Sequence, residues 1–177
     1  MRKLKNEELN RLTPEAFRAH PKNPVILLLD DVRSLHNVGS AFRTADAFLL
    51  EKIVLCGITG SPPHREINKT ALGATESVTW EYHPDAVTAA AELKSSGHRL
   101  VAVEQADESI SLNKFSPDPN GKYVLIFGNE VKGVKDELVG MADHVVEIPQ
   151  SGTKHSLNIS VSIGIVVWDF LNKMKTK

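Results

Sequence analysis

The chain has 177 residues, of which 41% are hydrophobic and 24% are charged, and its formal net charge is −1 at pH 7. This length and composition fit one globular domain, and so small a net charge gives no overall basic field that would attract nucleic acid. The single cysteine, Cys56, excludes a disulfide framework and a cysteine-based zinc site. Because apolar runs such as Val25–Leu29 are short and no signal-peptide core is present, we expect a cytoplasmic protein without a membrane span.

The first 24 residues are expected to form a basic arm that precedes the main domain, residues 25–177. Six Lys or Arg residues against three Glu residues give the arm a charge of +3, and three prolines interrupt it. Helices are predicted over Leu4–Leu12 and Glu15–His20, laid against the body of the domain. A charged end of this kind either keeps a protein soluble or contacts nucleic acid, and the sequence leaves both open.

Short apolar runs alternate with helical patterns through the rest of the chain. Strands are predicted at Val25–Leu29, Lys52–Cys56, Val78–Tyr82, Arg99–Glu104, Tyr123–Phe127 and His144–Ile148. Helices are predicted at Val38–Leu49, Pro84–Ser96, Val134–Met141 and Leu157–Lys173. Wholly apolar strands that alternate with helices favour an α/β fold, a mostly parallel sheet flanked by helices. Ligands bind such sheets beyond the carboxyl ends of the strands, so the loops that follow strands are the candidate sites.

Several common nucleotide and hydrolase motifs are absent from these loops. No Gly-x-Gly-x-x-Gly and no Gly-x-Ser-x-Gly occurs, which argues against a dinucleotide site and an α/β-hydrolase. The spacing of Gly128 and Gly133 fits a phosphate-binding P-loop, but Val134 and Lys135 stand where Lys and Ser or Thr are required. The seven histidines include no pair at helical spacing, so we expect no metal site.

The first informative segment, residues 30–46, runs from a strand end into a helix. Asn37, Ser40 and Arg43 fall three residues apart and therefore share one helix face. In one interpretation Asn37 caps the helix and Arg43 is a solvated charge. In the other, an amide and a guanidinium lie together at the carboxyl edge of the sheet and bind a phosphate or carboxylate.

The second segment, residues 125–133, leads an apolar strand directly into Gly128, with Glu130 just beyond it. Gly128 and Gly133 either form simple turns beside a solvated Glu130, or let the backbone approach a ligand closely.

The third segment, residues 148–168, places Ser156 where it could cap a helix that is apolar on most sides. Such a helix should be buried in the domain or at a subunit contact. A cap does not account for the polar Asn158 and Ser160 at the start of an apolar helix, and this favours a functional site.

Together, the three segments resemble the three motifs of the SpoU-type (TrmH-like) RNA ribose 2′-O-methyltransferases of the SPOUT superfamily, over roughly 25–171. The matching motifs are Asn37-x-Gly39-x-x-x-Arg43-x-Ala45, Phe127-Gly-x-Glu130-x-x-Gly133 and Ile148-Pro-x-x-Gly152-x-x-x-Ser156-Leu-Asn-x-Ser160. Residues 69–76 also resemble a segment in the middle of those enzymes. The departures are Gln150 and Ser162, where the family commonly has Met and a small apolar residue.

This resemblance implies a C-terminal trefoil knot, a homodimer, and S-adenosylmethionine (SAM) as methyl donor without a metal. It also implies roles for individual residues. The cofactor-binding positions would be Gly128, Ile148 and Leu157, and the active-site positions would be Asn37, Arg43, Glu130, Ser156 and Asn158.

The substrate implied by the resemblance is RNA, and we expect tRNA rather than rRNA because the chain is compact. Given the small net charge, binding would depend on local patches, namely the N-terminal arm, Arg65, Lys69 and Lys154. Two alternatives stay open at this point. The chain could be a knotted RNA-binding module without activity, or it could methylate a base instead of a ribose.

Overall fold

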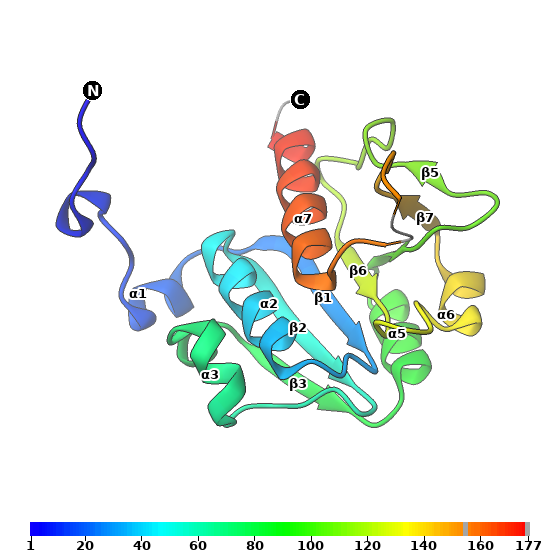
Figure 1. Cartoon of the computed structure of the whole chain (residues 1–177), viewed down its shortest axis with the longest axis horizontal. Helices are drawn as coiled ribbons and strands as arrows, with labels where there is room; N and C mark the ends of the chain where they lie inside the picture. The colour runs from blue at the N-terminus through cyan, green and yellow to red at the C-terminus, as the bar shows by residue number, and fades with distance from the viewer. Residues whose placement is uncertain (154–155, 176–177) are drawn as a thin grey trace.

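A seven-stranded parallel sheet forms the centre of the molecule in the computed structural model, which describes residues 1–153 and 156–175 (Figure 1). Neighbouring strands follow the order β3-β2-β1-β6-β4-β7-β5, and every pair is parallel. The strands are β1 (Asn23–Asp30), β2 (Leu50–Cys56), β3 (Trp80–His83), β4 (Arg99–Val103), β5 (Ile110–Ser111), β6 (Tyr123–Phe127) and β7 (His144–Glu147). The α/β fold with a mostly parallel sheet is therefore confirmed.

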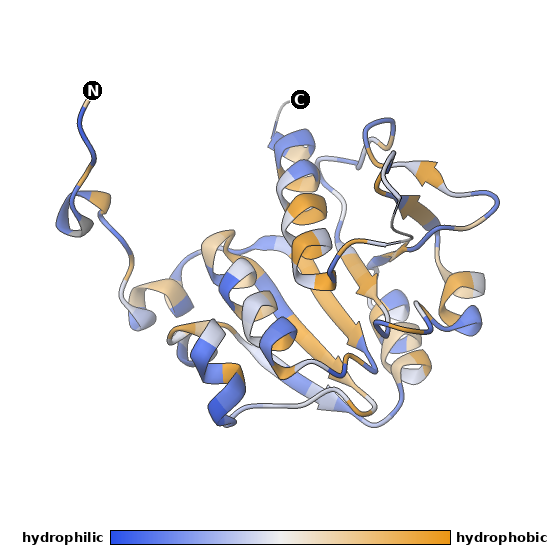
Figure 2. Ribbon diagram, in the orientation of Figure 1, coloured by the Kyte–Doolittle hydropathy of each residue, from blue (hydrophilic) through white to orange (hydrophobic). Residues whose placement is uncertain are grey.

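Helices cover both faces of this sheet. They are α1 (Pro14–Ala19), α2 (Leu35–Ala47), α3 (Arg65–Ala71), α4 (Ala74–Ser77), α5 (Ala86–Ser95), α6 (Asp136–Met141) and α7 (Ile159–Lys175), with a 3₁₀ turn, η1, at Asn6–Leu9. Alternate residues of β1 enter different cores: Leu27 packs with the residues of α2 and α7, and Leu28 with those of α5 and α6. Strands buried on both faces must be apolar throughout, which explains the continuous apolar runs in the sequence (Figure 2).

Several predicted elements differ from the structure at their ends. Helix α2 begins at Leu35, because the Ser34 hydroxyl caps it by accepting the N–H of Asn37 at 3.3 Å. Asn37 is therefore not the cap. Helix α7 begins at Ile159, two residues later than predicted. The helices α3 and α4 and the two-residue strand β5 were not predicted, since each is too short for a hydrophobic period to show.

The first residues do not form the predicted helix. Leu4–Leu12 contains only the 3₁₀ turn η1, which stands away from the sheet in Figure 1, and Leu4 is exposed. Helix α1, in contrast, packs on the domain, because Phe17 is 4% exposed and belongs to the core. The Arg18 guanidinium also donates to the carbonyl of Glu76 at 2.7 Å. Only the second half of the expected arm lies against the body.

Candidate active site

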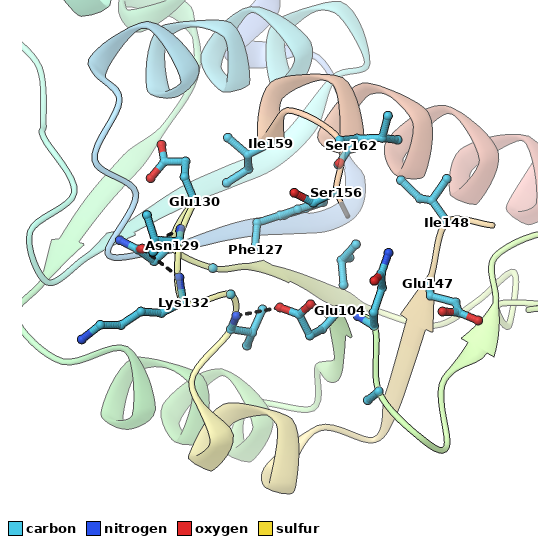
Figure 3. Close-up of a pocket in the computed structure, with 18 of the residues that line it drawn as sticks. Glu104, Phe127, Asn129, Glu130, Lys132, Glu147, Ile148, Ser156, Ile159 and Ser162 are labelled. Atoms are coloured by element: carbon cyan, nitrogen blue, oxygen red, sulfur yellow. Dashed lines mark hydrogen bonds between the residues drawn. The ribbon is translucent and has the colours of Figure 1, made fainter. Parts of the chain in front are cut away.

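A cleft of about 770 Å³ lies where the carboxyl ends of β4, β6 and β7 meet the start of α7 (Figure 3). These strands are neighbours in the sheet, so loops that are far apart in the sequence come together at this edge. Its walls are formed by residues 103–106, 127–134, 136, 139, 147, 148, 150, 156–159 and 162. Most of the second and third predicted motifs therefore face one cavity.

All three residues predicted to bind the cofactor line this cleft: Gly128, Ile148 and Leu157. The loop from Gly128 to Gly133 folds back on itself, with hydrogen bonds in both directions between the backbones of Asn129 and Gly133, at 3.0 and 2.9 Å. A Cβ on Gly128 would lie 2.2 Å from the backbone of Gly133, so only glycine fits there. Gly128 is therefore required for a tight turn, which is the first of the two roles that the sequence left open.

A chain of hydrogen bonds joins the three predicted motifs. The Asn158 amide donates to Oδ1 of Asn37 at 3.2 Å, and the Asn37 amide donates to Oε1 of Glu130 at 3.1 Å. The Glu130 carboxylate also accepts the backbone N–H groups of Arg33 and Ser34, each at 3.0 Å. We call Asn158, Asn37 and Glu130 the motif network. It joins one residue from each motif, and two of the three, Glu130 and Asn158, line the cleft.

Glu130 is held as a carboxylate in this network. Partial burial raises the pKa of Glu130, but the N–H groups of Arg33, Glu130 itself and Ser34, together with the Asn37 amide, lower it by more. The net result is a pKa below the usual value for glutamate. With its oxygens occupied by fixed donors, Glu130 is suited to holding loops in place rather than to exchanging protons.

Ser156 lines the cleft, but the prediction that it caps α7 is wrong. Asn158 takes that role, because its Oδ1 accepts the backbone N–H of Ser160 at 2.9 Å and the Ser160 hydroxyl at 2.6 Å. The polar residues that were unexpected in an apolar helix thus have a local explanation. The same Asn158 side chain caps α7 with its oxygen and reaches Asn37 with its nitrogen.

Arg43 is the predicted site residue that lies apart from the others. It is exposed on α2, does not line the cleft, and makes no hydrogen bond or ion pair within residues 1–153 and 156–175. Asn37, by contrast, is only 9% exposed. The structure therefore brings the predicted residues together with the single exception of this arginine.

Two groups that the sequence did not single out hold the loop 128–134 in place from two sides. The Lys135 ammonium lies 2.7 Å from Asp30 and 3.0 Å from Asp31, and Asp30 is only 1% exposed. Burial lowers the pKa of Lys135, but the two carboxylates raise it by more, so it stays above its usual value. On the other side, Glu104 accepts the N–H of Val134 at 2.9 Å. The sequence shows Asp30 and Asp31 at the end of an apolar strand, but it does not show that Lys135 pairs with them.

The cleft has an acidic lining. Among the described residues that form it are four carboxylates, Glu104, Glu130, Asp136 and Glu147, and one ammonium group, Lys132. Anionic nucleotides are normally held by basic side chains and by helix N-termini. A cationic ligand suits this lining better.

Neither a metal cluster nor a membrane helix is found in the described parts of the chain. Within residues 1–153 and 156–175, no three His, Cys, Asp or Glu side chains come together as metal ligands could. None of the helices there combines the length and the apolar character that crossing a membrane needs. Lys154, one of the expected basic patches, lies outside the described residues.

The sequence matches the SpoU rRNA Methylase family over residues 24–168. Similar curated proteins include the 23S rRNA (guanosine-2′-O-)-methyltransferase RlmB of Haemophilus ducreyi, 27% identical over 96% of this chain and 68% of its own length. The tRNA (guanosine(18)-2′-O)-methyltransferase of Aquifex aeolicus is 30% identical over 86% of this chain and 71% of its own. The chain thus spans about two thirds of the length of these relatives.

Solved structures give the same result. The A. aeolicus TrmH/SpoU tRNA modifying enzyme superposes with a TM-score of 0.78 at 28% identity, covering 90% of this chain and 79% of its own. The AdoMet-bound rRNA methyltransferase from Sinorhizobium meliloti gives 0.77 at 28% identity, covering 86% and 58%. The fold and the cleft thus define an α/β methyltransferase domain. The chain belongs to the SpoU rRNA Methylase family, which confirms the resemblance inferred from its motifs.

The motif network should make folding sensitive to acid through Glu130. Its pKa is lowered in the folded chain and returns to ~4.3 on unfolding. Ionised Glu130 therefore stabilises the fold above that pH, and the contribution is lost as the pH falls through the folded value. Glu130→Gln should flatten the decline of the unfolding free energy between about pH 5 and pH 3, measured by urea titration.

Glu108→Gln is the matched control, because Glu108 is exposed and has no hydrogen bond or ion pair within the described residues. It should keep the wild-type pH profile. A Glu130→Gln profile that runs parallel to the wild type would contradict the assignment.

Proposed function

We propose that this chain transfers the methyl group of SAM to a ribose 2′-hydroxyl of tRNA or rRNA, in the cleft beside the motif network. Its family and its relatives make it a SAM-dependent RNA 2′-O-methyltransferase. The observation that carries the proposal for the site is the hydrogen-bonded chain Asn158–Asn37–Glu130, which joins all three motifs at the lip of a cofactor-sized cleft.

The cleft fits SAM in size and in chemistry. Its volume of about 770 Å³ lies within the range of small-molecule sites. The acidic lining suits a sulfonium cation, while Ile148 and Leu157 offer apolar contacts and the loop at Gly128 offers backbone groups. We assign the binding of SAM to these three residues. When bound, SAM supplies a methyl group that is already activated by positive sulfur, so we expect no metal to be needed.

The residues of the chain have to position the acceptor, because the methyl group can be taken only by an oxygen in line with the breaking bond. We assign this positioning to hydrogen bonds from Asn37 and Asn158. Glu130 and Ser156 shape the loops around them. Arginine is a poor proton acceptor, so we do not assign the role of base to Arg43. In our proposal Arg43 holds the phosphate next to the acceptor ribose, and that phosphate takes the proton of the 2′-hydroxyl.

Arg43 needs a second copy of the chain for this role. It is exposed and outside the cleft of its own chain, on the helix α2 that packs against α7. One face of α7 is apolar and exposed, at Val161, Ile165 and Trp168. The latter two line an apolar groove of about 580 Å³. We propose a homodimer that covers this stripe and brings Arg43 to the cleft of the partner.

A trefoil knot is the topology that we propose for the C-terminal part. Strand β7 lies between β4 and β5, whereas α7 returns to pack on α2. In the described part of the segment that joins them, Ile148, Gln150, Ser156, Leu157 and Asn158 share the cleft with the loop 128–134. Their place beside that loop supports a threaded chain, as in the family.

The exposed basic groups are proposed to bind the RNA. They are the N-terminal arm with Arg65 and Lys69, which two subunits would present twice. We favour tRNA as the substrate because the chain is compact, and we place the protein in the cytoplasm, where tRNA and ribosomes work.

The function can be tested by mapping 2′-O-methyl groups in RNA from cells with and without this gene. We expect one ribose of tRNA or rRNA to lose its methyl group, and the gene to restore it. An unchanged map, with SAM binding intact, would favour a non-catalytic RNA-binding module. A lost base methylation would favour the other alternative.

Arg43 provides a sharper test of the mechanism. If Arg43 grips phosphate through two N–H groups, Arg43→Lys should fail nearly as badly as Arg43→Ala, because an ammonium cannot reproduce the planar fork. Single-turnover rates should fall roughly 10²- to 10⁴-fold in both variants. SAM affinity, measured by calorimetry, should change less than about twofold, since Arg43 would meet RNA rather than cofactor. Full activity of Arg43→Lys would contradict the two-point contact and would mean that only the positive charge of Arg43 is needed.

The dimer can be tested on α7. Trp168 is 59% exposed in the stripe, so Trp168→Glu should bury a charge in the proposed contact and shift sedimentation from dimer to monomer. Leu72→Glu is the control, because Leu72 is an apolar residue that is 66% exposed at the C-cap of α3, away from the stripe. A wild-type chain that sediments only as a monomer at micromolar concentration would contradict the dimer.

A further inference from the structure

Glu104 is a carboxylate of the cleft whose only role so far is to hold the loop 128–134 through Val134. It follows β4 directly and lines the cleft (Figure 3). Its Oε2 accepts the N–H of Val134 and its Oε1 accepts the N–H of Gln105, both at 2.9 Å. A Cβ on Gly133 would lie 2.2 Å from Oε2, so the carboxylate is pressed against the loop that forms the opposite wall.

This carboxylate has acceptor capacity to spare. An ionised carboxylate offers about four acceptor positions, and the two N–H groups use two of them. Within residues 1–153 and 156–175 no cation pairs with Glu104 and no other donor reaches it. About two adjacent acceptor positions therefore remain on a fixed group in the wall of a ligand cleft.

The order of the strands indicates which part of a bound cofactor Glu104 would meet. The motif network follows β1 and β6, and β4 lies one strand further along the sheet. If the reacting sulfur lies beside the network, the nucleoside extends past the end of β4 towards β7 and Ile148. A ribose diol offers two adjacent donors, which match the two acceptor positions that are left. Carboxylates at strand ends accept ribose hydroxyls in other nucleoside sites.

We propose that Glu104 accepts hydrogen bonds from the two ribose hydroxyls of SAM while it holds the loop 128–134 in place. This inference rests on the proposed function and adds to it a cofactor-binding residue outside the three motifs. One carboxylate thereby couples the shape of the cleft to the presence of the nucleoside.

Calorimetry with three ligands tests it: S-adenosylhomocysteine, its 2′,3′-dideoxy analogue, and 5′-methylthioadenosine, which lacks the amino-acid part. The wild type should bind the dideoxy analogue about 10- to 100-fold more weakly than S-adenosylhomocysteine, the scale of charge-assisted hydrogen bonds. Glu104→Gln should bind S-adenosylhomocysteine and 5′-methylthioadenosine, which both have the diol, about tenfold or more weakly than the wild type does. On the dideoxy analogue it should match the wild type within about twofold.

Glu108→Gln, which removes a charge from the same loop outside the cleft, should bind all three ligands like the wild type. Equal wild-type affinity for the natural and dideoxy ligands would overturn the inference, and this comparison needs no variant. If Glu104→Gln weakened the binding of all three ligands equally, Glu104 would only hold the loop 128–134 and would not bind the diol. If Glu104→Gln weakened the binding of the other two ligands but not that of 5′-methylthioadenosine, Glu104 would contact the amino group of the cofactor and not its ribose. A wild type that binds none of them would instead overturn the proposed function.

Discussion

The carboxylate of Glu130 is the acceptor on which the arrangement of the site depends. It accepts hydrogen bonds from the backbone N–H groups of Arg33 and Ser34, in the loop after β1, and from the side-chain amide of Asn37 in α2. All three residues are more than 90 positions away in the sequence. Through Asn37 the contact extends to Asn158 at the start of α7. Because the Glu130 carboxylate is ionised, the three hydrogen bonds that it accepts are charge-assisted, which makes them stronger than bonds between neutral groups. The three motifs therefore hold one another in place.

The loop 128–134 is also supported from two sides. Lys135 ties its far end to Asp30 and Asp31 beneath the sheet edge, and Glu104 ties Val134 to the end of β4. Chemistry that relies on alignment needs a site that is already formed before the substrate binds. A loop fixed by three carboxylates and held in a narrow turn by Gly128 meets that need.

The sequence predicted the sheet because its signals are local: apolar strands such as Tyr123–Phe127 are readable from the residues alone. The candidate site residues were predicted from the resemblance of three motifs to SpoU-type enzymes, since the residues alone left a structural role open for Asn37, Arg43 and Glu130. The helix caps at Ser34 and Asn158 were misplaced, since several polar residues competed for each and only the backbone decides among them. The partners of Glu104 could not be predicted, because the strand order that brings β4 beside β6 is a property of the whole fold.

The position of the methyl group in the product tests the account most directly. Purified protein would be incubated with SAM labelled in its methyl group and with unmodified tRNA and rRNA, and the RNA digested to nucleosides for mass spectrometry. The account predicts that the label is found in a 2′-O-methylnucleoside, and that a substrate with 2′-deoxyribose at that position accepts none. Label on a base, or transfer to the deoxy substrate, would contradict it.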